Sequence, residues 1–208
     1  MGATLDRPTP LRASGLNPDP IEQFRGWFAE AEAHEDIPFA EATCLSTLGP
    51  EQTPEGRMVL LKGCDARGFV FFTNVRSNKG RSLRAHPKAG MTFHWAPLGR
   101  QVRIRGRVQK VSAEEADAYF ASRPRGSQIG AWASNQSRVL ESREGLERRV
   151  EELTEQYEGD EVPRPPHWSG FRIVPDEIEF WQEGEFRLHD RFVFRRSGGT
   201  WNSVRLSP

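Results

Sequence analysis

The chain has 208 residues, 36% of them hydrophobic and 28% charged, a composition that supports one folded domain and excludes a chain that is disordered throughout. Lysine plus arginine and aspartate plus glutamate number 29 each, so the formal net charge is zero and no overall field attracts nucleic acid or an anionic membrane. We find no signal peptide and no apolar run of the roughly 18 residues that a spanning helix needs, and we expect a soluble, cytoplasmic protein without nucleic-acid or membrane partners.

Residues 1–18 contain three prolines and little periodic hydrophobicity, which predicts a disordered N-terminal arm. Residues 19–208 then form a single predicted domain. Its first element is an amphipathic helix, because Asp19 can cap it and Pro20 suits its first position. One face of this helix carries Ile21, Phe24, Trp27, Phe28 and Ala31.

Between about residues 43 and 111 the hydrophobic period falls to two, and Gly, Pro, Asn and Asp separate short β-rich runs. This pattern predicts a meander of strands at 43–47, 57–62, 69–74, 90–95 and 101–111. In the last of them apolar residues alternate with arginines, so one face should be buried and the other solvated. The arginines lack interleaved aromatic residues, and we therefore interpret them as a solvated sheet face rather than a nucleic-acid surface.

The second half of the chain mixes helices and strands. A capping box at Ser112 opens a helix that stops near Pro124, and residues 123–137 read as an irregular connection. A longer helix is expected at about 142–157. Strands follow at 170–174, 177–182, 191–196 and 200–205, and the last two form a hairpin through Ser197–Gly199. Strands at both ends of the chain predict a mainly β fold with peripheral helices, closed into a barrel by the terminal hairpin.

Cys44 and Cys64 stand alone, without the spacing of a zinc site or a disulfide framework, and we expect two reduced thiols and no metal.

Four polar segments could carry chemistry. In the first, Arg57 and Lys62 flank an apolar strand and are followed by Thr73 and Lys79, a combination that suits a phosphate monoester. The ordinary alternative is the solvated end of an edge strand.

The second segment places Tyr119 before Arg123 and Ser127, which could form another anion pocket or a plain polar loop. The third, residues 132–137, offers Gln136 and Ser137 as hydrogen-bonding groups and is uninformative by itself. In the fourth, Arg187, His189 and Arg191 alternate along a run that we read as extended, so all three should project to one side, next to Trp181. A solvated strand face is the alternative there.

Together and in order, several segments resemble the pyridoxamine 5'-phosphate oxidase family. They are RMVLLK (57–62), FFTN (71–74), RQVRIRG (100–106), SRPRGSQIGAWASNQS (122–137), EFWQEGEFRLHDRFVFRR (179–196) and the closing WNSVRLSP. The resemblance implies an FMN-binding split β-barrel, with a C-terminal dimerisation segment at about 168–208 and a homodimer that binds FMN at the subunit interface. It also implies a pyridoxal 5'-phosphate synthase that oxidises pyridoxamine or pyridoxine 5'-phosphate with O2, yielding H2O2, in vitamin B6 biosynthesis and salvage.

The same resemblance assigns residues. FMN contacts fall on Arg57, Met58, Val59, Leu60, Leu61, Lys62, Phe72, Thr73, Asn78, Lys79, Gln101, Gln136, Ser137, Trp181 and Arg191. Substrate contacts fall on Lys62, Tyr119, Arg123 and Ser127 at the phosphate, and on Arg187 and His189 at the pyridine ring. Arg187 is expected to cover and polarise that ring as a catalytic residue, and His189 to add a hydrogen bond.

The chain departs from the family at Asn78, where an arginine beside Lys79 is common, and at the N-terminal arm, which lacks the Arg and Tyr that cover the substrate in some members. Other functions stay open at this point. One is a flavin oxidase of the same fold acting on another substrate, as in phenazine-pathway relatives. The other is a protein that binds FMN or pyridoxal phosphate without catalysing a reaction, or a barrel dimer without ligand.

Overall fold

The computed structural model describes residues 10–208, so the first half of the expected disordered arm lies outside the described residues. Residues 10–18 follow a defined path that includes a short turn of 3-10 helix, η1 (Ala13–Gly15). The Leu11 backbone N–H donates to Asp190 Oδ2 at 2.8 Å, and Arg205 donates to the Leu11 carbonyl at 3.1 Å. The start of the described chain is therefore attached to its C-terminal strands.

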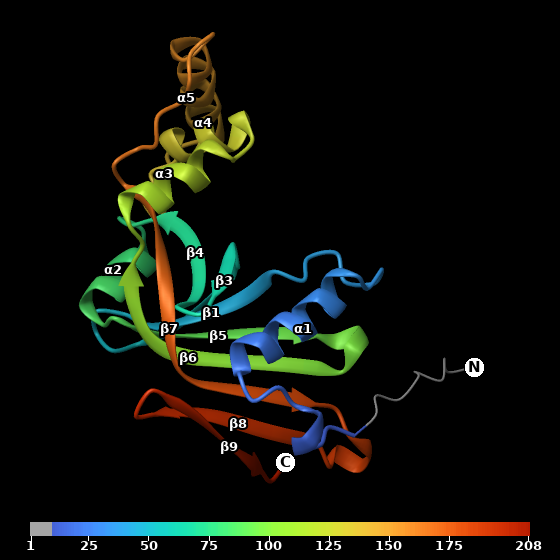
Figure 1. Ribbon diagram of the computed structural model, residues 1–208. Coiled ribbons are helices and arrows are strands. Elements are labelled where there is room, and N and C mark those ends of the chain that lie inside the picture. Colours follow the sequence, from blue (N-terminus) through green and yellow to red (C-terminus); the bar gives the residue numbers. More distant parts are fainter. Residues whose placement is uncertain (1–9) are drawn as a thin grey trace.

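The strands form one antiparallel sheet, and the helices lie around it (Figure 1). The strands are β1 (Ala42–Leu48), β2 (Pro54–Leu60), β3 (Gly63–Asp65), β4 (Gly68–Asn74), β5 (Lys88–Trp95), β6 (Arg100–Lys110), β7 (Trp168–Gln182), β8 (Asp190–Ser197) and β9 (Thr200–Leu206). The helices are α1 (Pro20–Glu32), α2 (Asn78–Ala85), α3 (Ala113–Ala121), α4 (Arg125–Ala133) and α5 (Arg143–Gln156), with short 3-10 turns η2 (Ala96–Leu98) and η3 (Glu185–Arg187).

The sheet runs in the order β2-β1-β5-β6-β7-β4-β3. β7 covers both strands predicted at 170–174 and 177–182, and its first half pairs with β4 while its second half pairs with β8. The terminal hairpin β8–β9 thus pairs with β7 and not with the early strands, so the prediction that it closes the barrel is wrong. The sheet is instead curled and split at β7, which is the split-barrel fold that the sequence predicted in outline.

The main core lies between α1 and the concave side of the sheet. α1 begins as predicted, with the Asp19 side chain accepting from the Ile21 N–H at 2.8 Å and Pro20 in the first turn. Phe24 is fully buried and meets Phe69 edge-to-face at 4.9 Å, and Trp27 meets Phe180 in the same way at 5.2 Å. The alternation predicted for β6 is confirmed, because Val102, Ile104 and Val108 are buried while Arg103, Arg105 and Arg107 are exposed.

A second, smaller core holds α3, α4 and α5 together at one end of the sheet (Figure 1). The predictions of α3 and α5 are confirmed, and Ser112 caps α3 by accepting from the Glu115 N–H. The irregular connection predicted at 123–137 is wrong, because it contains α4. Gly126 and Gly130 weaken the local helix signal, but Ile129 is buried in this core and Ala133 is also buried, so packing stabilises the helix.

The split depends on a bulge between Arg105 and Gly106, where β6 shifts register against β7. A Cβ atom at Gly106 would lie 2.0 Å from the Val174 carbonyl oxygen, so no larger residue fits without moving the backbone.

We therefore expect Gly106→Ala to lower the free energy of unfolding by about 2–3 kcal/mol, measured by urea denaturation. Gly26→Ala is the matched control: it lies in α1 with nothing near its Cβ position, and should raise the free energy of unfolding by about 0.5–1 kcal/mol. Equal effects of the two variants would contradict this account of the bulge.

Candidate active site

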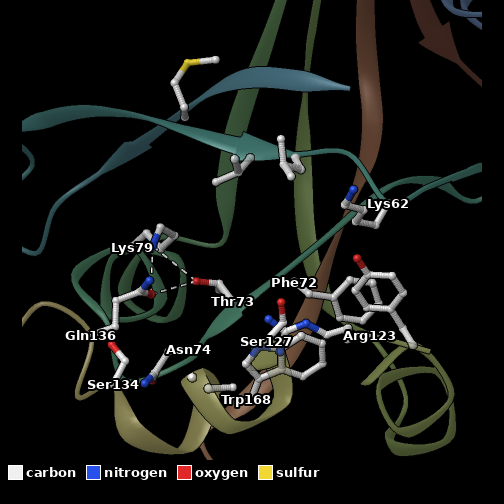
Figure 2. Close-up of a pocket in the computed structure, with 16 residues that line it drawn as sticks. Lys62, Phe72, Thr73, Asn74, Lys79, Arg123, Ser127, Ser134, Gln136 and Trp168 are labelled. Atoms are coloured by element: carbon white, nitrogen blue, oxygen red, sulfur yellow. Dashed lines mark hydrogen bonds between the residues drawn. The ribbon is translucent and has the colours of Figure 1, made fainter. Parts of the chain in front are cut away.

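A pocket of about 460 Å³ opens between β2, β4 and the α3–α4 pair (Figure 2). Its volume is in the range of small-molecule sites. Its lining comes from segments far apart in the sequence: Met58, Val59, Leu60, Lys62, Phe72, Thr73, Asn74, Lys79, Tyr119, Arg123, Ser127, Gly130, Ala131, Ser134, Gln136 and Trp168. Figure 2 shows cationic side chains at two places on its wall, Lys79 on one side and Lys62 with Arg123 on the other.

The first cationic place is built around Lys79 in the first turn of α2. Its Nζ lies 3.3 Å from Thr73 Oγ1 and 3.1 Å from Gln136 Oε1, and these two oxygens lie 3.2 Å apart. Both partners are neutral, and Lys79 has no carboxylate partner in the described part of the chain. Burial, and after it the charge of Arg57, lowers the pKa of Lys79. A half-buried cation with neutral partners is suited to an incoming anion.

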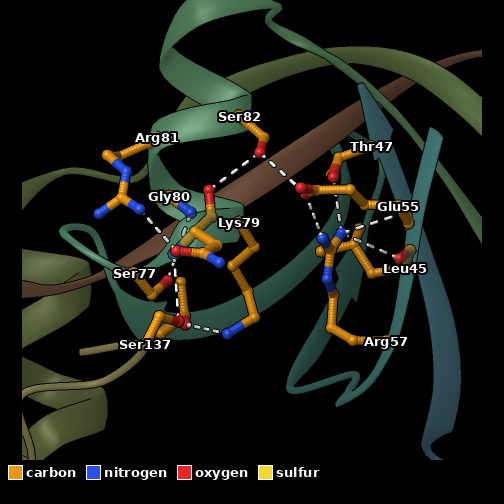
Figure 3. Close-up of polar contacts among 12 residues, drawn as sticks. Leu45, Thr47, Glu55, Arg57, Ser77, Lys79, Gly80, Arg81, Ser82 and Ser137 are labelled. Carbon is orange, nitrogen blue, oxygen red and sulfur yellow. Dashed lines mark hydrogen bonds and ion pairs between the residues drawn. The ribbon is translucent and has the colours of Figure 1, made fainter. Parts of the chain in front are cut away.

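Further polar groups surround the start of α2 (Figure 3). The Asn78 backbone N–H donates to Ser137 Oγ at 3.2 Å, and Ser77 caps the helix by accepting from the Gly80 N–H. Asn78 Oδ1 accepts from Arg81 Nη2 at 2.6 Å, so a guanidinium lies beside the position that lacks the arginine common in the resembled family. Helix α2 was not predicted, because the eight-residue segment is too short and polar to show a period.

Arg57 is held apart from this cluster by its own partners. Its guanidinium donates to Thr47 Oγ1 at 2.6 Å and to Glu55 Oε2 at 2.7 Å, and Ser82 Oγ donates to the same Glu55 oxygen at 3.1 Å (Figure 3). Arg57 does not line the pocket, but its positive charge contributes to the lowered pKa of Lys79.

The second cationic place is built by the α3–α4 connection. Tyr119, Arg123 and Ser127 are spaced four residues apart across the bend between the two helices, and all three line the pocket together with Lys62 from the end of β2. Arg123 Nη1 is buried without a hydrogen-bond partner among the described residues. Burial lowers the pKa of Arg123, an arginine that nonetheless stays charged. A buried donor without an acceptor is costly unless a ligand satisfies it.

A group of aromatic rings from the smaller core forms the pocket wall beside Arg123. Phe72 contacts Tyr119, at 4.1 Å and 20°, and Trp168, at 5.2 Å and 8°, and the Tyr119 and Trp168 rings lie 6.1 Å apart. The Arg123 guanidinium lies over the Trp168 ring at 5.0 Å and over the Phe120 ring at 5.6 Å. This wall is flat, rigid and apolar, with a cation fixed on its surface.

The remaining predicted residues form a separate cluster where β7 meets β8. The Trp181 and His189 rings lie 4.6 Å apart, His189 Nδ1 accepts from the Gly184 N–H at 3.2 Å, and Arg191 Nε donates to Glu179 Oε1 at 3.0 Å. Gln101 is the cross-strand neighbour of Trp181. None of these residues lines the pocket.

The extended run predicted for 187–191 is wrong. Arg187 closes the turn η3, and both Phe186 and Arg187 have positive φ, at 54° and 65°. Only Arg191 lies in a strand, so Arg187, His189 and Arg191 do not alternate along one. Non-glycine residues in this backbone region are strained and are enriched at functional sites, and Gly184 permits the tight turn, since a Cβ there would lie 2.1 Å from the Leu188 carbonyl oxygen.

The pocket thus gathers part of the predicted set. It brings together Met58, Val59, Leu60, Lys62, Phe72, Thr73, Lys79, Tyr119, Arg123, Ser127 and Gln136. It does not include Arg57, Leu61, Asn78, Gln101, Ser137, Trp181, Arg187, His189 or Arg191. Leu61 is buried in the main core.

Sequence reasoning missed three polar or aromatic lining residues, Asn74, Ser134 and Trp168. Asn74 ends β4 and Ser134 ends α4, positions that only become part of a pocket once both elements are placed. Trp168 had a weak signal: it is a tryptophan directly after a proline-rich stop, at the start of a strand.

The arrangement offers two cationic sites for anions and a flat aromatic wall beside the second of them. Within residues 10–208 no three His, Cys, Asp or Glu side chains are placed to hold a metal ion, and none of the described helices could cross a membrane. Both described cysteines are free thiols and neither lines the pocket. The site is therefore equipped to bind and orient a planar, phosphorylated or doubly anionic ligand.

Comparison with known proteins bears on this site. Residues 29–157 match the model of the pyridoxamine 5'-phosphate oxidase family, and residues 168–208 match the pyridoxine 5'-phosphate oxidase C-terminal dimerisation region. A pyridoxine/pyridoxamine 5'-phosphate oxidase of Burkholderia multivorans is 56% identical over 92% of this chain and 90% of its own length. One from Myxococcus xanthus is 52% identical over 99% of both chains.

Solved structures agree on the fold. PhzG from Burkholderia lata, in complex with tetrahydrophenazine-1-carboxylic acid, is 30% identical with a TM-score of 0.87, covering 95% of this chain and 98% of its own. A pyridoxamine 5'-phosphate oxidase-related, FMN-binding protein from Nostoc punctiforme is 17% identical with a TM-score of 0.71, covering 89% and 97%.

The cysteine environment gives a testable prediction. Burial raises the pKa of the Cys64 thiol to about 12, although Arg25 acts in the opposite direction. The nucleophilic thiolate is then scarce at pH 8. We expect Cys64 to react with iodoacetamide at least about tenfold more slowly in the folded protein than in guanidinium chloride, as measured by peptide mass spectrometry. Equal labelling rates in the two states would contradict the buried environment.

Proposed function

Because the chain belongs to the pyridoxamine 5'-phosphate oxidase family, we propose that it oxidises pyridoxamine and pyridoxine 5'-phosphates to pyridoxal 5'-phosphate, with O2 as electron acceptor and H2O2 as product. A cytoplasmic role in pyridoxal phosphate synthesis is part of the proposal. The observation that carries it is Arg123, whose buried Nη1 has no acceptor among the described residues and lies in a pocket with Lys62, Tyr119 and Ser127. A phosphate ester supplies the missing acceptor.

FMN is the cofactor of this family, and the pocket residues fit it. Lys79, Thr73 and Gln136 form the charged and polar cluster that would hold its phosphate, with Ser137 and Asn78 adjacent. Met58 and Leu60, which line the pocket beside them, are exposed and offer apolar contact for a flat ring. When bound, FMN supplies the two-electron chemistry by accepting a hydride and passing the electrons to O2.

The protein's own task is then binding and orientation. In our proposal Lys62, Tyr119, Arg123 and Ser127 clamp the substrate phosphate, and this clamp fixes how far the rest of the substrate reaches along the pocket. The aromatic wall of Phe72 and its neighbours excludes water from one side. We assign no strong general base to the pocket.

The roles proposed for Arg187 and His189 require a second copy of the chain. Cross-strand register places Met58, Gln101, Trp181 and Arg191 on the same face of the sheet, opposite the face that α1 covers. Four strand spacings of about 4.8 Å separate β2 from β7, or about 19 Å along the sheet, so the two clusters do not line one pocket within a chain. In a two-fold dimer each copy can bring its β7–β8 end to the other's pocket, and the match of 168–208 to a dimerisation region supports this arrangement.

A second candidate is an oxidase of a phenazine precursor, since PhzG shares the fold at 30% identity. The cations of the pocket favour the phosphorylated substrate. Arg123 and Lys79 have no carboxylate partner among the described residues, and Lys62, which pairs with Glu41 at 3.5 Å, lies beside Arg123. Together they provide more positive charge than one cofactor phosphate requires, and a second anionic group is the simplest use for it.

The direct test is anaerobic. FMN-loaded protein is mixed with pyridoxine 5'-phosphate, and the visible flavin band is followed. We expect the band to bleach, to return when air is admitted, and pyridoxal 5'-phosphate to accumulate. A bound flavin that stays oxidised with both pyridoxine 5'-phosphate and pyridoxamine 5'-phosphate would refute the proposed substrates. The same assay with tetrahydrophenazine-1-carboxylic acid would then test the second candidate.

Two neighbouring arginines give a matched pair of variants. Arg123→Ala removes a charged phosphate contact, and we expect KM for pyridoxine 5'-phosphate to rise about ten- to hundredfold with a smaller change in kcat. Arg125→Ala is the control, because Arg125 donates to the carbonyls of Asp160 and Tyr157 and lies outside the pocket. Steady-state kinetics on both variants would contradict the phosphate clamp if their KM values rose equally.

A further inference from the structure

We propose that Trp168 is a positioning residue of this site: its indole ring, rather than a carboxylate, holds the Arg123 guanidinium in place for the substrate phosphate. The inference deepens the proposed function and rests on it. Nothing in the sequence resemblance assigned Trp168 a role, and its contacts with Arg123 emerge only in the folded chain.

The indole is itself held rigidly. Trp168 is 6% exposed and begins β7 opposite Asn74. Its ring stacks on Phe72 and meets Phe120 edge-to-face at 5.1 Å, and its backbone carbonyl accepts from Arg164 Nη1 at 2.7 Å. An indole held by two neighbouring aromatic rings is a rigid surface against which a second group can pack.

The Arg123 guanidinium lies over the Trp168 ring and has no carboxylate partner among the described residues. Arg123 lies 5.0 Å above the Trp168 ring, within cation–π range, and has no ion pair with any described carboxylate. Arg172 shows the usual solution for a buried arginine in this protein: it is 6% exposed and pairs with both Asp65 and Glu115, at 2.8 and 2.7 Å. The two arginines are thus held in place by different means.

The difference has a chemical consequence. A carboxylate beside Arg123 would occupy its N–H donors and repel a phosphate dianion, whereas an aromatic face contacts the flat side of the guanidinium and leaves the donors at its edge free. The buried Nη1 of Arg123 without an acceptor is such a free donor. Holding the cation by a ring keeps the pocket positively charged for the ligand.

The test measures affinity as well as turnover. Pyridoxal 5'-phosphate binding to FMN-loaded protein is measured by equilibrium dialysis for the native chain, Trp168→Phe and Trp168→Leu. We expect Trp168→Leu to weaken binding, and to raise KM for pyridoxine 5'-phosphate, by about five- to thirtyfold, with Trp168→Phe intermediate. FMN occupancy should stay within about twofold of the native chain, and the loss should fall on KM more than on kcat.

Two further variants separate positioning from general stability. Trp132→Leu is the control, since Trp132 belongs to the same small core, donates to the Pro163 carbonyl and does not line the pocket. In an Arg123→Ala background, Trp168→Leu should change ligand affinity by less than about twofold, because its effect runs through Arg123.

The outcomes separate the two proposals. Unchanged affinity in Trp168→Leu, an equal loss in Trp132→Leu, or the same loss in the Arg123→Ala background would each overturn the role of Trp168. A native chain that binds pyridoxal 5'-phosphate, and loses affinity in Trp168→Leu, but never reduces its flavin with either B6 phosphate would support the positioning role and refute the oxidase proposal. A native chain that does not bind pyridoxal 5'-phosphate would overturn the positioning role.

Discussion

The architecture depends on one strand. β7 pairs with β4 along its first half, with β8 along its second half and with β6 along nearly its whole length. Because β6 shifts register at Gly106, β7 can leave one part of the curled sheet and enter the other. Its first residue, Trp168, lines the pocket, and Trp181 near its end belongs to the second cluster. The same strand therefore builds both clusters and holds them apart.

The chain has no net charge, and the positive charge of the site depends on which arginines and lysines are not paired with a carboxylate. Most buried or half-buried arginines are neutralised: Arg172 by two carboxylates, Arg191 by Glu179 and Arg57 by Glu55. Lys79 and Arg123 have neutral or aromatic partners among the described residues. Both have their pKa lowered by burial. An anion bound beside each group would stabilise its charged form, and a protein without net charge can bind phosphorylated ligands through such local sites.

Local signals were sufficient where sequence and packing agree. The capped start of α1, the alternation of β6 and the glycine turn between β8 and β9, where Gly198 and Gly199 have positive φ, all appear as predicted. The local signals failed where tertiary contacts override secondary-structure propensity. α4 contains two glycines and is stabilised by its buried face, and the segment around Arg187 turns sharply although its residues alternate as a strand would.

The sequence by itself determined the family, the mainly β fold and most of the residues that line the pocket, because these depend on the order and type of side chains along each element. The tertiary structure decided which of those residues meet. Arg123 and Trp168 are far apart in the chain and come together only when β7 packs against α3 and α4. Arg187 lies away from Lys79 and outside the pocket, because it belongs to the connection between β7 and β8. Such contacts depend on long-range packing and register, which no local pattern of residues encodes.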